Sequence, residues 1–301
     1  MINPTIYVVL PVHNRINVTK NFISCLKRQI YKNYHLVLVD DGSTDGTAEY
    51  VKQQIDNLTV LYGNGNLWWA GSLSKAYRYL SKIKADDEDI VLIGNDDTTF
   101  DLDYFDKVIN DRDLKSGTLV VSPGHSISSD PTSLRAKIER GFAIDWPSLR
   151  VYKLEERQEP DAVTTRGLYM HYATYKSLGP LHPWLLPHYL SDLEYTIRAK
   201  RRGFKLIISR DTHVYADRSK TGSHRDDSKT LKEFLFNHLV SKKTAYNTFY
   251  WGNFVLLAAP WKHKLKGFVI VYTRFYRKLI NFYKNRRQVL KACSRNETIS
   301  H

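Results

Sequence analysis

The sequence predicts an α/β protein with a doubly wound, mostly parallel sheet and a helical appendage at its carboxyl end. Short apolar runs without polar alternation lie at 6–10, 36–39, 58–62 and 90–93, and such runs are typical of strands buried on both faces. Apolar residues at helical spacing fill the segments between them. Strands that alternate with helices in this way form parallel sheets covered by helices. The alternation stops before residue 228, where aromatic and basic stretches begin.

The individual elements follow from local signals. The first strand is expected to stop at Pro11 and the first helix to cover about 17–30. A second helix is expected over about 45–55, capped by Ser43 or Asp45. Further elements are expected as a helix at 73–83 and strands at 118–122, 164–170 and 204–208, whereas 123–160 gives no clear pattern.

The composition describes an ordinary globular protein, with 42% hydrophobic and 25% charged residues among 301. The net charge of +14 attracts polyanions such as nucleic acid, an anionic membrane or a phosphorylated substrate. Two cysteines argue against a disulfide framework and for a reducing compartment. We recognise no secretory leader and no apolar run of the ~18 residues that span a bilayer, so we expect a cytoplasmic protein.

Small and acidic residues follow each of the first four strands. They occupy 11–14, 40–43, 64–71 and 95–97. Because the carboxyl ends of parallel strands meet at one edge of a sheet, we expect these loops to line one crevice. The acidic cluster suits Mg²⁺ or Mn²⁺ held with a substrate phosphate, unless Asp96 and Asp97 only cap the helix that begins near Asp103. No G-x-G-x-x-G turn follows the first strand, which argues against a dinucleotide enzyme.

Three motifs and the acidic cluster carry a resemblance to a known family. They are Leu10-Pro11-Val12-His13-Asn14, Val39-Asp40-Asp41-Gly42-Ser43-Thr44-Asp45-Gly46, Asn66-Leu67-Trp68-Trp69-Ala70-Gly71 and Asn95-Asp96-Asp97. In this order they resemble the inverting family 2 glycosyltransferases of the GT-A fold, over roughly the first three quarters of the chain. Two positions depart from the family. Its metal motif is usually Asp-x-Asp but begins here with Asn95, and Trp68 stands where the family often has glycine.

The resemblance implies a nucleotide-sugar site with a divalent metal, Mg²⁺ or Mn²⁺. The residues that it assigns to the nucleotide sugar are Pro11, Val12, His13, Asn14, Asp40, Asp41, Asn66, Trp69, Gly71, Asn95 and Asp96. It assigns the metal to Asp97, and either His213 or Asp217 can take the role of a further ligand. For Asp40 and Asp41 the alternative is turn chemistry, although two adjacent carboxylates are costly at a strand end unless something binds them.

A second cluster opens a later helix. It reads Pro187-His188-Tyr189-Leu190-Ser191-Asp192-Leu193-Glu194-Tyr195 and precedes the basic run Arg198-Ala199-Lys200-Arg201-Arg202-Gly203. The family places its catalytic base here, usually in a Glu-Asp pair. Ser191 replaces the Glu, so the resemblance implies Asp192 as the base and Glu194 as the second candidate. The alternative is that Asp192 is only an amino-terminal cap.

The carboxyl-terminal region, 226–301, differs in character from the expected GT-A domain at 1–225. Aromatic residues such as Trp251, Trp261 and Tyr272 are interleaved with basic residues. This pattern is typical of interfacial helices on an anionic membrane surface. The alternatives are a helical cap packed on the core, which accounts for the apolar face, and a nucleic-acid patch, which accounts for the charge.

Taken together, these features predict a metal-dependent inverting glycosyltransferase. Asp192 would deprotonate a hydroxyl group of a glycan or lipid-linked glycan acceptor, which then attacks a UDP- or dTDP-linked sugar. The expected setting is bacterial surface polysaccharide (O-antigen or capsule) biosynthesis at the inner face of the cell membrane, without a nucleic-acid partner. The alternatives are a basic nucleic-acid-binding protein, against which the acidic crevice argues, and a catalytically silent relative with Asn95 and Ser191 at motif positions.

Overall fold

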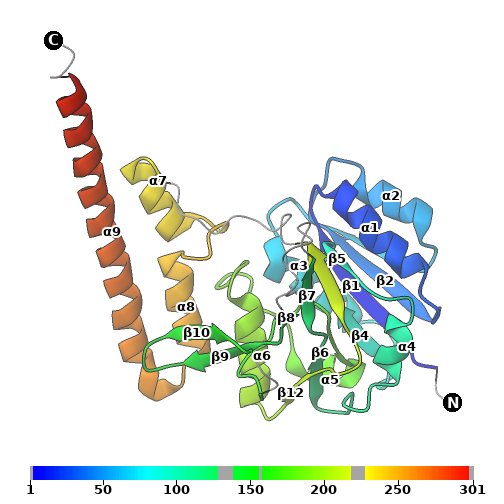
Figure 1. Ribbon diagram of the computed structural model, residues 1–301. Coiled ribbons are helices and arrows are strands. Elements are labelled where there is room, and N and C mark those ends of the chain that lie inside the picture. The colour runs from blue at the N-terminus through cyan, green and yellow to red at the C-terminus, as the bar shows by residue number, and fades with distance from the viewer. Residues whose placement is uncertain (1–2, 128–137, 156–157, 218–227, 298–301) are drawn as a thin grey trace. The chain divides into compact units, whose positions relative to one another are not determined.

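The computed structural model describes residues 3–127, 138–155, 158–217 and 228–297 (Figure 1). The chain divides into two compact units. The first comprises Met1–Ile144 and Val151–Arg225, and the second comprises Asp145–Arg150 and Asp226–His301. The loops of the predicted crevice all belong to the first unit, so the candidate site lies within that unit.

A seven-stranded sheet forms the centre of the first unit, in the order β12-β6-β11-β4-β1-β2-β3. Its strands are β1 (Ile6–Val12), β2 (Tyr34–Asp40), β3 (Leu58–Tyr62), β4 (Ile90–Ile93), β6 (Thr118–Val121), β11 (Leu168–His171) and β12 (Lys205–Ile208). Only β11 runs antiparallel to its neighbours, β4 and β6, while the other pairs are parallel. The predicted fold class, a mostly parallel α/β sheet with a carboxyl-terminal helical region, is therefore confirmed.

Helices cover both faces of this sheet. On one face lie α1 (Ile16–Lys27), α2 (Thr47–Gln54) and α4 (Tyr104–Ile109), and on the other lie α3 (Trp68–Leu80), α5 (Tyr172–Leu178) and α6 (Ser191–Arg201). Successive residues of a strand point to opposite faces, so Val8 packs with the first group and Val9 with the second. This double coverage explains why the strands read as continuous apolar runs.

The first strand does not stop at Pro11, as was predicted, but continues to Val12. The pairing of β1 with β4 ends at Val9, whereas its pairing with β2 continues to Val12. Pro11 thus lies where β1 has a neighbour on one side only, and a proline is tolerated at such an edge.

The region 123–160, in which no clear pattern was found, contributes strands to two smaller sheets. One has the order β5-β13-β7-β8, from β5 (Thr98–Thr99), β13 (Val214–Asp217), β7 (Gly124–Ile127) and β8 (Ile138–Glu139). The other pairs β9 (Phe142–Asp145) with β10 (Arg150–Lys153). These strands are short, and β13 pairs with strands that are distant in the sequence, which explains why local pattern did not predict them.

The second unit is largely helical. It contains α7 (Leu231–Leu235), the π-helix η2 (Phe236–Val240), α8 (Thr248–Ala258) and α9 (Trp261–Glu297). Leu149, Val255, Ala259 and Val271 form its small core. Helix α9 approaches α8 closely at Gly267, where a Cβ would lie 2.8 Å from Val255. Among the described residues, none of the helices combines the length and apolarity that crossing a membrane requires.

Candidate active site

Hydrogen bonds join the loops that follow β1 and β2. The Asn14 amide donates to Ser43 Oγ at 3.0 Å, and Asn14 Oδ1 accepts from the Thr44 amide at 2.7 Å. Asp45 accepts from the Ile16 amide at 2.8 Å, at the start of α1, and also from the Thr47 amide at 3.1 Å, at the start of α2. Asn14 and Asp45 therefore fix the two loops as one edge of the site.

Asp41 organises the loop after β3. Its carboxylate accepts from three amides, those of Gly65, Leu67 and Trp68, at 2.9, 2.8 and 3.0 Å. Gly63 lies so close that a Cβ there would be 2.4 Å from Asp41 Oδ1. The carboxylate thus holds the start of α3 in place, a role that the sequence did not reveal. Asp40, the other member of the predicted pair, is buried as well, and its Oδ1 accepts from the Ser43 amide at 2.8 Å.

The other residues predicted to bind the nucleotide sugar divide into exposed and buried ones. His13 is exposed, and its Nδ1 donates to the Asp41 carbonyl at 2.7 Å. Pro11 and Val12 are buried in β1, so only their backbone is available to a ligand.

The Asn66–Gly71 motif also serves mainly structural roles. Asn66 Oδ1 accepts from Trp68 Nε1 at 2.9 Å, and Trp69 Nε1 donates to Thr165 Oγ1 at 3.1 Å. Gly71 is buried, and a Cβ there would lie 3.1 Å from the Leu67 Cβ. Gly71 therefore allows close packing within α3. Trp68 has a left-handed φ of 59°. Its ring lies 5.6 Å from that of His188, so the indole faces the loop before α6.

The acidic cluster after β4 pairs with two arginines. Arg15 lies 2.9 Å from Asp96 and 3.8 Å from Asp97, and Arg166 lies 3.7 Å from Asp97. Burial raises the pKa of Asp96 to about 6, although the Arg15 charge opposes the rise. Helix α4 has Asp103 as its N-cap, so the alternative that Asp96 and Asp97 cap that helix is wrong.

Two oxygens of this cluster are buried without a hydrogen-bond partner among the described residues, Asn95 Oδ1 and Asp97 Oδ1. A buried acceptor without a partner is unfavourable, and a divalent cation would satisfy both, because Mg²⁺ and Mn²⁺ prefer oxygen ligands. In the described ranges no three His, Cys, Asp or Glu side chains gather as a metal site. An ion here would therefore need further oxygens, such as those of a substrate phosphate.

The two candidates for a further metal ligand lie at the two ends of one short strand. Strand β13 ends at Asp217 and pairs antiparallel with β5, with Ala216 opposite Thr98. His213 lies directly before β13, and its Nδ1 is 3.0 Å from Nε2 of His125. Both residues therefore stay candidates.

Asp192 lies in the first turn of α6. Leu190, with a left-handed φ of 68°, is the N-cap, so Asp192 itself lies inside the helix and not at the cap position. Asp192 Oδ1 accepts from the Leu193 amide at 2.9 Å. Burial raises the pKa of Asp192 to about 6, and the hydrogen bond from the Leu193 amide opposes this rise.

Sequence reasoning missed Arg15 and Arg166. The sequence does place each arginine in a loop near the predicted acidic crevice. Only the fold shows that both arginines reach the Asp97 carboxylate.

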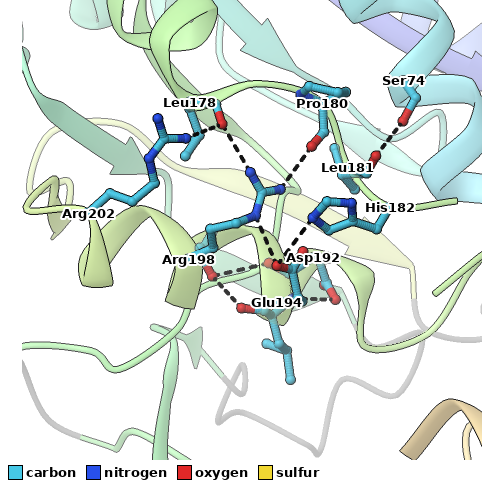
Figure 2. A network of polar contacts seen from close by, with 11 residues as sticks. Ser74, Leu178, Pro180, Leu181, His182, Asp192, Glu194, Arg198 and Arg202 are labelled. Atoms are coloured by element: carbon cyan, nitrogen blue, oxygen red, sulfur yellow. Dashed lines mark hydrogen bonds and ion pairs between the residues drawn. The ribbon is translucent and has the colours of Figure 1, made fainter. Parts of the chain in front are cut away.

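Glu194 belongs to a polar network around the loop before α6 (Figure 2). Its buried carboxylate lies 2.9 Å from Arg198 Nε and 4.0 Å from His182 Nε2. Arg198 also donates to the carbonyls of Leu178 and Pro180, at 3.0 and 2.9 Å. Glu194 thus neutralises an arginine that anchors this loop, and it stays the second candidate for the base after Asp192.

Known proteins match this chain in sequence and in fold. The profile of the family described as Glycosyl transferase family 2 matches residues 7–176. An uncharacterised glycosyltransferase of Rickettsia prowazekii is 29% identical over 89 residues, which are 28% of this chain and 28% of that protein. The matched stretch thus spans little more than a quarter of that relative.

Two solved structures share the fold. The mannosyltransferase PcManGT from Pyrobaculum calidifontis, in complex with GDP-Man and Mn²⁺, has a TM-score of 0.51 at 17% identity, covering 84% of this chain and 74% of its own. GalNAc-T7 with UDP, GalNAc and Mn²⁺ has a TM-score of 0.54 at 14% identity, covering 89% of this chain and 54% of its own. At these identities the likeness concerns the fold alone.

Proposed function

Because the chain belongs to glycosyltransferase family 2 through the match over residues 7–176, we propose that it is a metal-dependent inverting glycosyltransferase. It moves a sugar from a UDP- or dTDP-linked donor to a hydroxyl group of a glycan. The observation that carries this proposal is the loop after β4, where Asn95 Oδ1 and Asp97 Oδ1 are buried without a hydrogen-bond partner among the described residues. Two such oxygens suit a divalent metal that is held together with a substrate diphosphate.

Asp97 and Asn95 would hold Mg²⁺ or Mn²⁺, with His213 or Asp217 as a further ligand. When bound, the ion would neutralise the negative charge of the departing nucleoside diphosphate. Arg15 and Arg166 pair with Asp96 and Asp97, but Arg15 Nη2 and Arg166 Nε are buried without a hydrogen-bond partner among the described residues. Both arginines are therefore available to donate to the diphosphate.

Asp192 accepts the proton of the acceptor hydroxyl, whose oxygen attacks the anomeric carbon from the face opposite the leaving group. A carboxylate with a pKa of about 6 is ionised at neutral pH and is more basic than an ordinary aspartate. Ser191, which stands where the family often has Glu, donates its hydroxyl to the His188 carbonyl. Its role is therefore in the helix start, and its presence does not argue for a silent relative.

A nucleotide-sugar screen tests the donor site. We expect one UDP- or dTDP-linked sugar to raise the melting temperature of the full chain with Mn²⁺ or Mg²⁺ but not with EDTA. Ligand at one hundred times its Kd stabilises the folded state by about 2.7 kcal/mol. The absence of any metal-dependent shift across the panel would contradict the proposal. Donor binding without sugar transfer and without donor hydrolysis would instead indicate a catalytically inactive member of the family.

Helix α9 supports a lipid-linked acceptor and a position at the inner face of the cell membrane. Its exposed apolar side chains are Trp261, Leu265, Val269, Tyr272, Tyr276 and Tyr283. At about 100° per residue they fall within an arc of about 80°. Exposed Lys262, Lys266, Arg277 and Lys284 fall in the adjacent arc, and 261–296 contains no Asp or Glu. An aromatic stripe beside a basic one suits an anionic bilayer.

Vesicle binding tests this surface. Replacing Trp261, Leu265, Tyr272 and Tyr276 together by alanine should weaken binding to phosphatidylcholine vesicles that contain phosphatidylglycerol by at least about tenfold. Stability should change little, because these side chains are exposed. Raising the salt concentration should also weaken binding, since each basic residue near the surface contributes about 1 kcal/mol. Trp184→Ala, which removes an exposed tryptophan of the first unit, is the control. Unchanged binding by the quadruple variant would exclude α9 as the membrane surface.

A further inference from the structure

A groove of about 360 Å³ lies beside α3, outside the site described above. Its lining residues include Ser74, Tyr77 and Arg78 of α3 and His182, Pro183 and Trp184 of the segment before α6. The proposed reaction assigns no role to any of these side chains.

The lining combines one flat aromatic surface with polar groups. Trp184 is 93% exposed, so its indole ring is almost entirely available to a ligand. Arg78 is exposed as well, and the side chain of His182 is 42% exposed. A free indole face beside hydrogen-bonding groups suits a sugar ring, which has an apolar C–H face and a rim of hydroxyl groups.

The groove is built on a rigid frame. Ser74 Oγ donates to the Leu181 carbonyl at 3.1 Å, and Tyr77 donates to the Lys176 carbonyl at 2.9 Å. His182 contacts the Glu194 carboxylate, whose partner Arg198 holds the preceding loop (Figure 2). The network around Glu194 therefore positions one wall of the groove.

The segment that lines the groove continues along the chain to the proposed catalytic base. Residues 181–187 run along α3. The Leu181 carbonyl accepts a hydrogen bond from Ser74 Oγ, and the Pro187 carbonyl accepts one from the Ala70 amide at 3.0 Å. These four helical residues correspond to about 6 Å of rise. Beyond Pro187 the chain continues through His188, which lies against Trp68, to α6 and Asp192.

We propose that this groove is an acceptor subsite, which binds a sugar residue of the acceptor glycan away from the hydroxyl that is glycosylated. Trp184 stacks on that sugar, and Arg78 and His182 bind its hydroxyl groups. The inference rests on the proposed function, because it presumes that the acceptor is a glycan. It goes beyond that function because it assigns a separate site for recognition of the acceptor. This site would select acceptor glycans by the sugar that precedes the one being glycosylated.

The test uses the full chain and a printed array of lipid-free oligosaccharides of two to four residues. The wild-type protein should bind a subset of them, and Trp184→Ala should weaken binding to that subset by about tenfold or more. Arg78→Ala should weaken binding to the same oligosaccharides. Trp261→Ala, which removes an exposed tryptophan of the second unit, should leave the array pattern unchanged.

Donor binding separates the two proposals. Calorimetry with UDP and with dTDP, each with Mn²⁺, should show binding of one nucleotide, with the same Kd for the wild type and for both groove variants, because the groove does not touch the donor. Absence of binding of both nucleotides in the wild type would contradict the proposed function. With donor binding intact, either a wild type that binds no glycan of the array or a Trp184→Ala variant that binds as tightly as the wild type would overturn the acceptor subsite.

Discussion

Asp192→Asn is expected to lower turnover by about 10²–10⁴-fold, the range that general-base catalysis supplies. Donor affinity should stay nearly unchanged, because the proposed base acts on the acceptor. Asparagine keeps the size of the side chain and its amide oxygen can still accept from Leu193. Steady-state kinetics with the donor found in the nucleotide-sugar screen, together with calorimetry, would measure both effects. Full activity in this variant would remove the start of α6 from the chemistry.

The pH dependence follows from the same residue. Burial raises the pKa of Asp192 to about 6, and the protonated acid cannot accept a proton, so turnover should fall about tenfold per pH unit below 6. The folded-state pKa lies above the unfolded value, so ionisation of Asp192 reduces stability as pH rises from about 4 to 6. Asp192→Asn should therefore not lower the melting temperature at pH 8. Burial raises the pKa of Asp96 as well. An Asp96→Asn variant should nevertheless keep the fall in turnover below about pH 6, because that fall is assigned to Asp192.

Glu194→Gln is the control for the position of the base. It weakens the ion pair with Arg198, and breaking a buried pair of this kind costs about 3–5 kcal/mol when a charge is left unpaired. We therefore expect a lower unfolding midpoint in urea, with turnover per folded molecule much less affected than in Asp192→Asn. Comparable losses of turnover in both variants, at full folding, would make Glu194 as strong a candidate for the base as Asp192.

Asp97→Asn is expected to abolish sugar transfer and to remove the divalent-metal requirement for nucleoside diphosphate binding. The substitution removes the negative charge from the carboxylate whose buried Oδ1 lacks a hydrogen-bond partner in the described structure. Changes in the outer shell of a metal site already cost 10–100-fold in affinity or activity, so loss of a direct ligand should cost more. Calorimetry of UDP binding with Mn²⁺ and with EDTA measures the effect independently of turnover.

The matched control is Asp103→Asn, which makes the same chemical change at an exposed residue that pairs with Lys107 on α4. It should leave metal-dependent binding and turnover unchanged. Normal divalent-dependent binding in Asp97→Asn would rule out Asp97 as a metal ligand. Circular dichroism should show the folded state in both variants, because Arg15 retains its pair with Asp96 at 2.9 Å.

Several features of the fold and of the candidate site were predictable from local sequence. Continuous apolar strands such as Ile90–Ile93 indicate a sheet covered on both faces. In a parallel sheet the strand ends then share one edge, so the convergence of the loops with Asp40 and Asp97 follows from topology. The position of Asp192 at the start of a helix also follows from the sequence around it. In each case the determining signal lies within a few residues or in the strand order.

The tertiary structure decided what depends on contacts between distant segments. The three amides that bind Asp41 come from the loop after the next strand. Arg166 reaches Asp97 from a loop that is distant in the sequence. The spacing of two residues between Asp192 and Glu194 puts their side chains on different sides of α6, but only the folded structure shows that Glu194 pairs with Arg198, which holds the loop at Leu178. Such roles cannot be read from composition or periodicity, because the partner that defines each one is brought close only by folding.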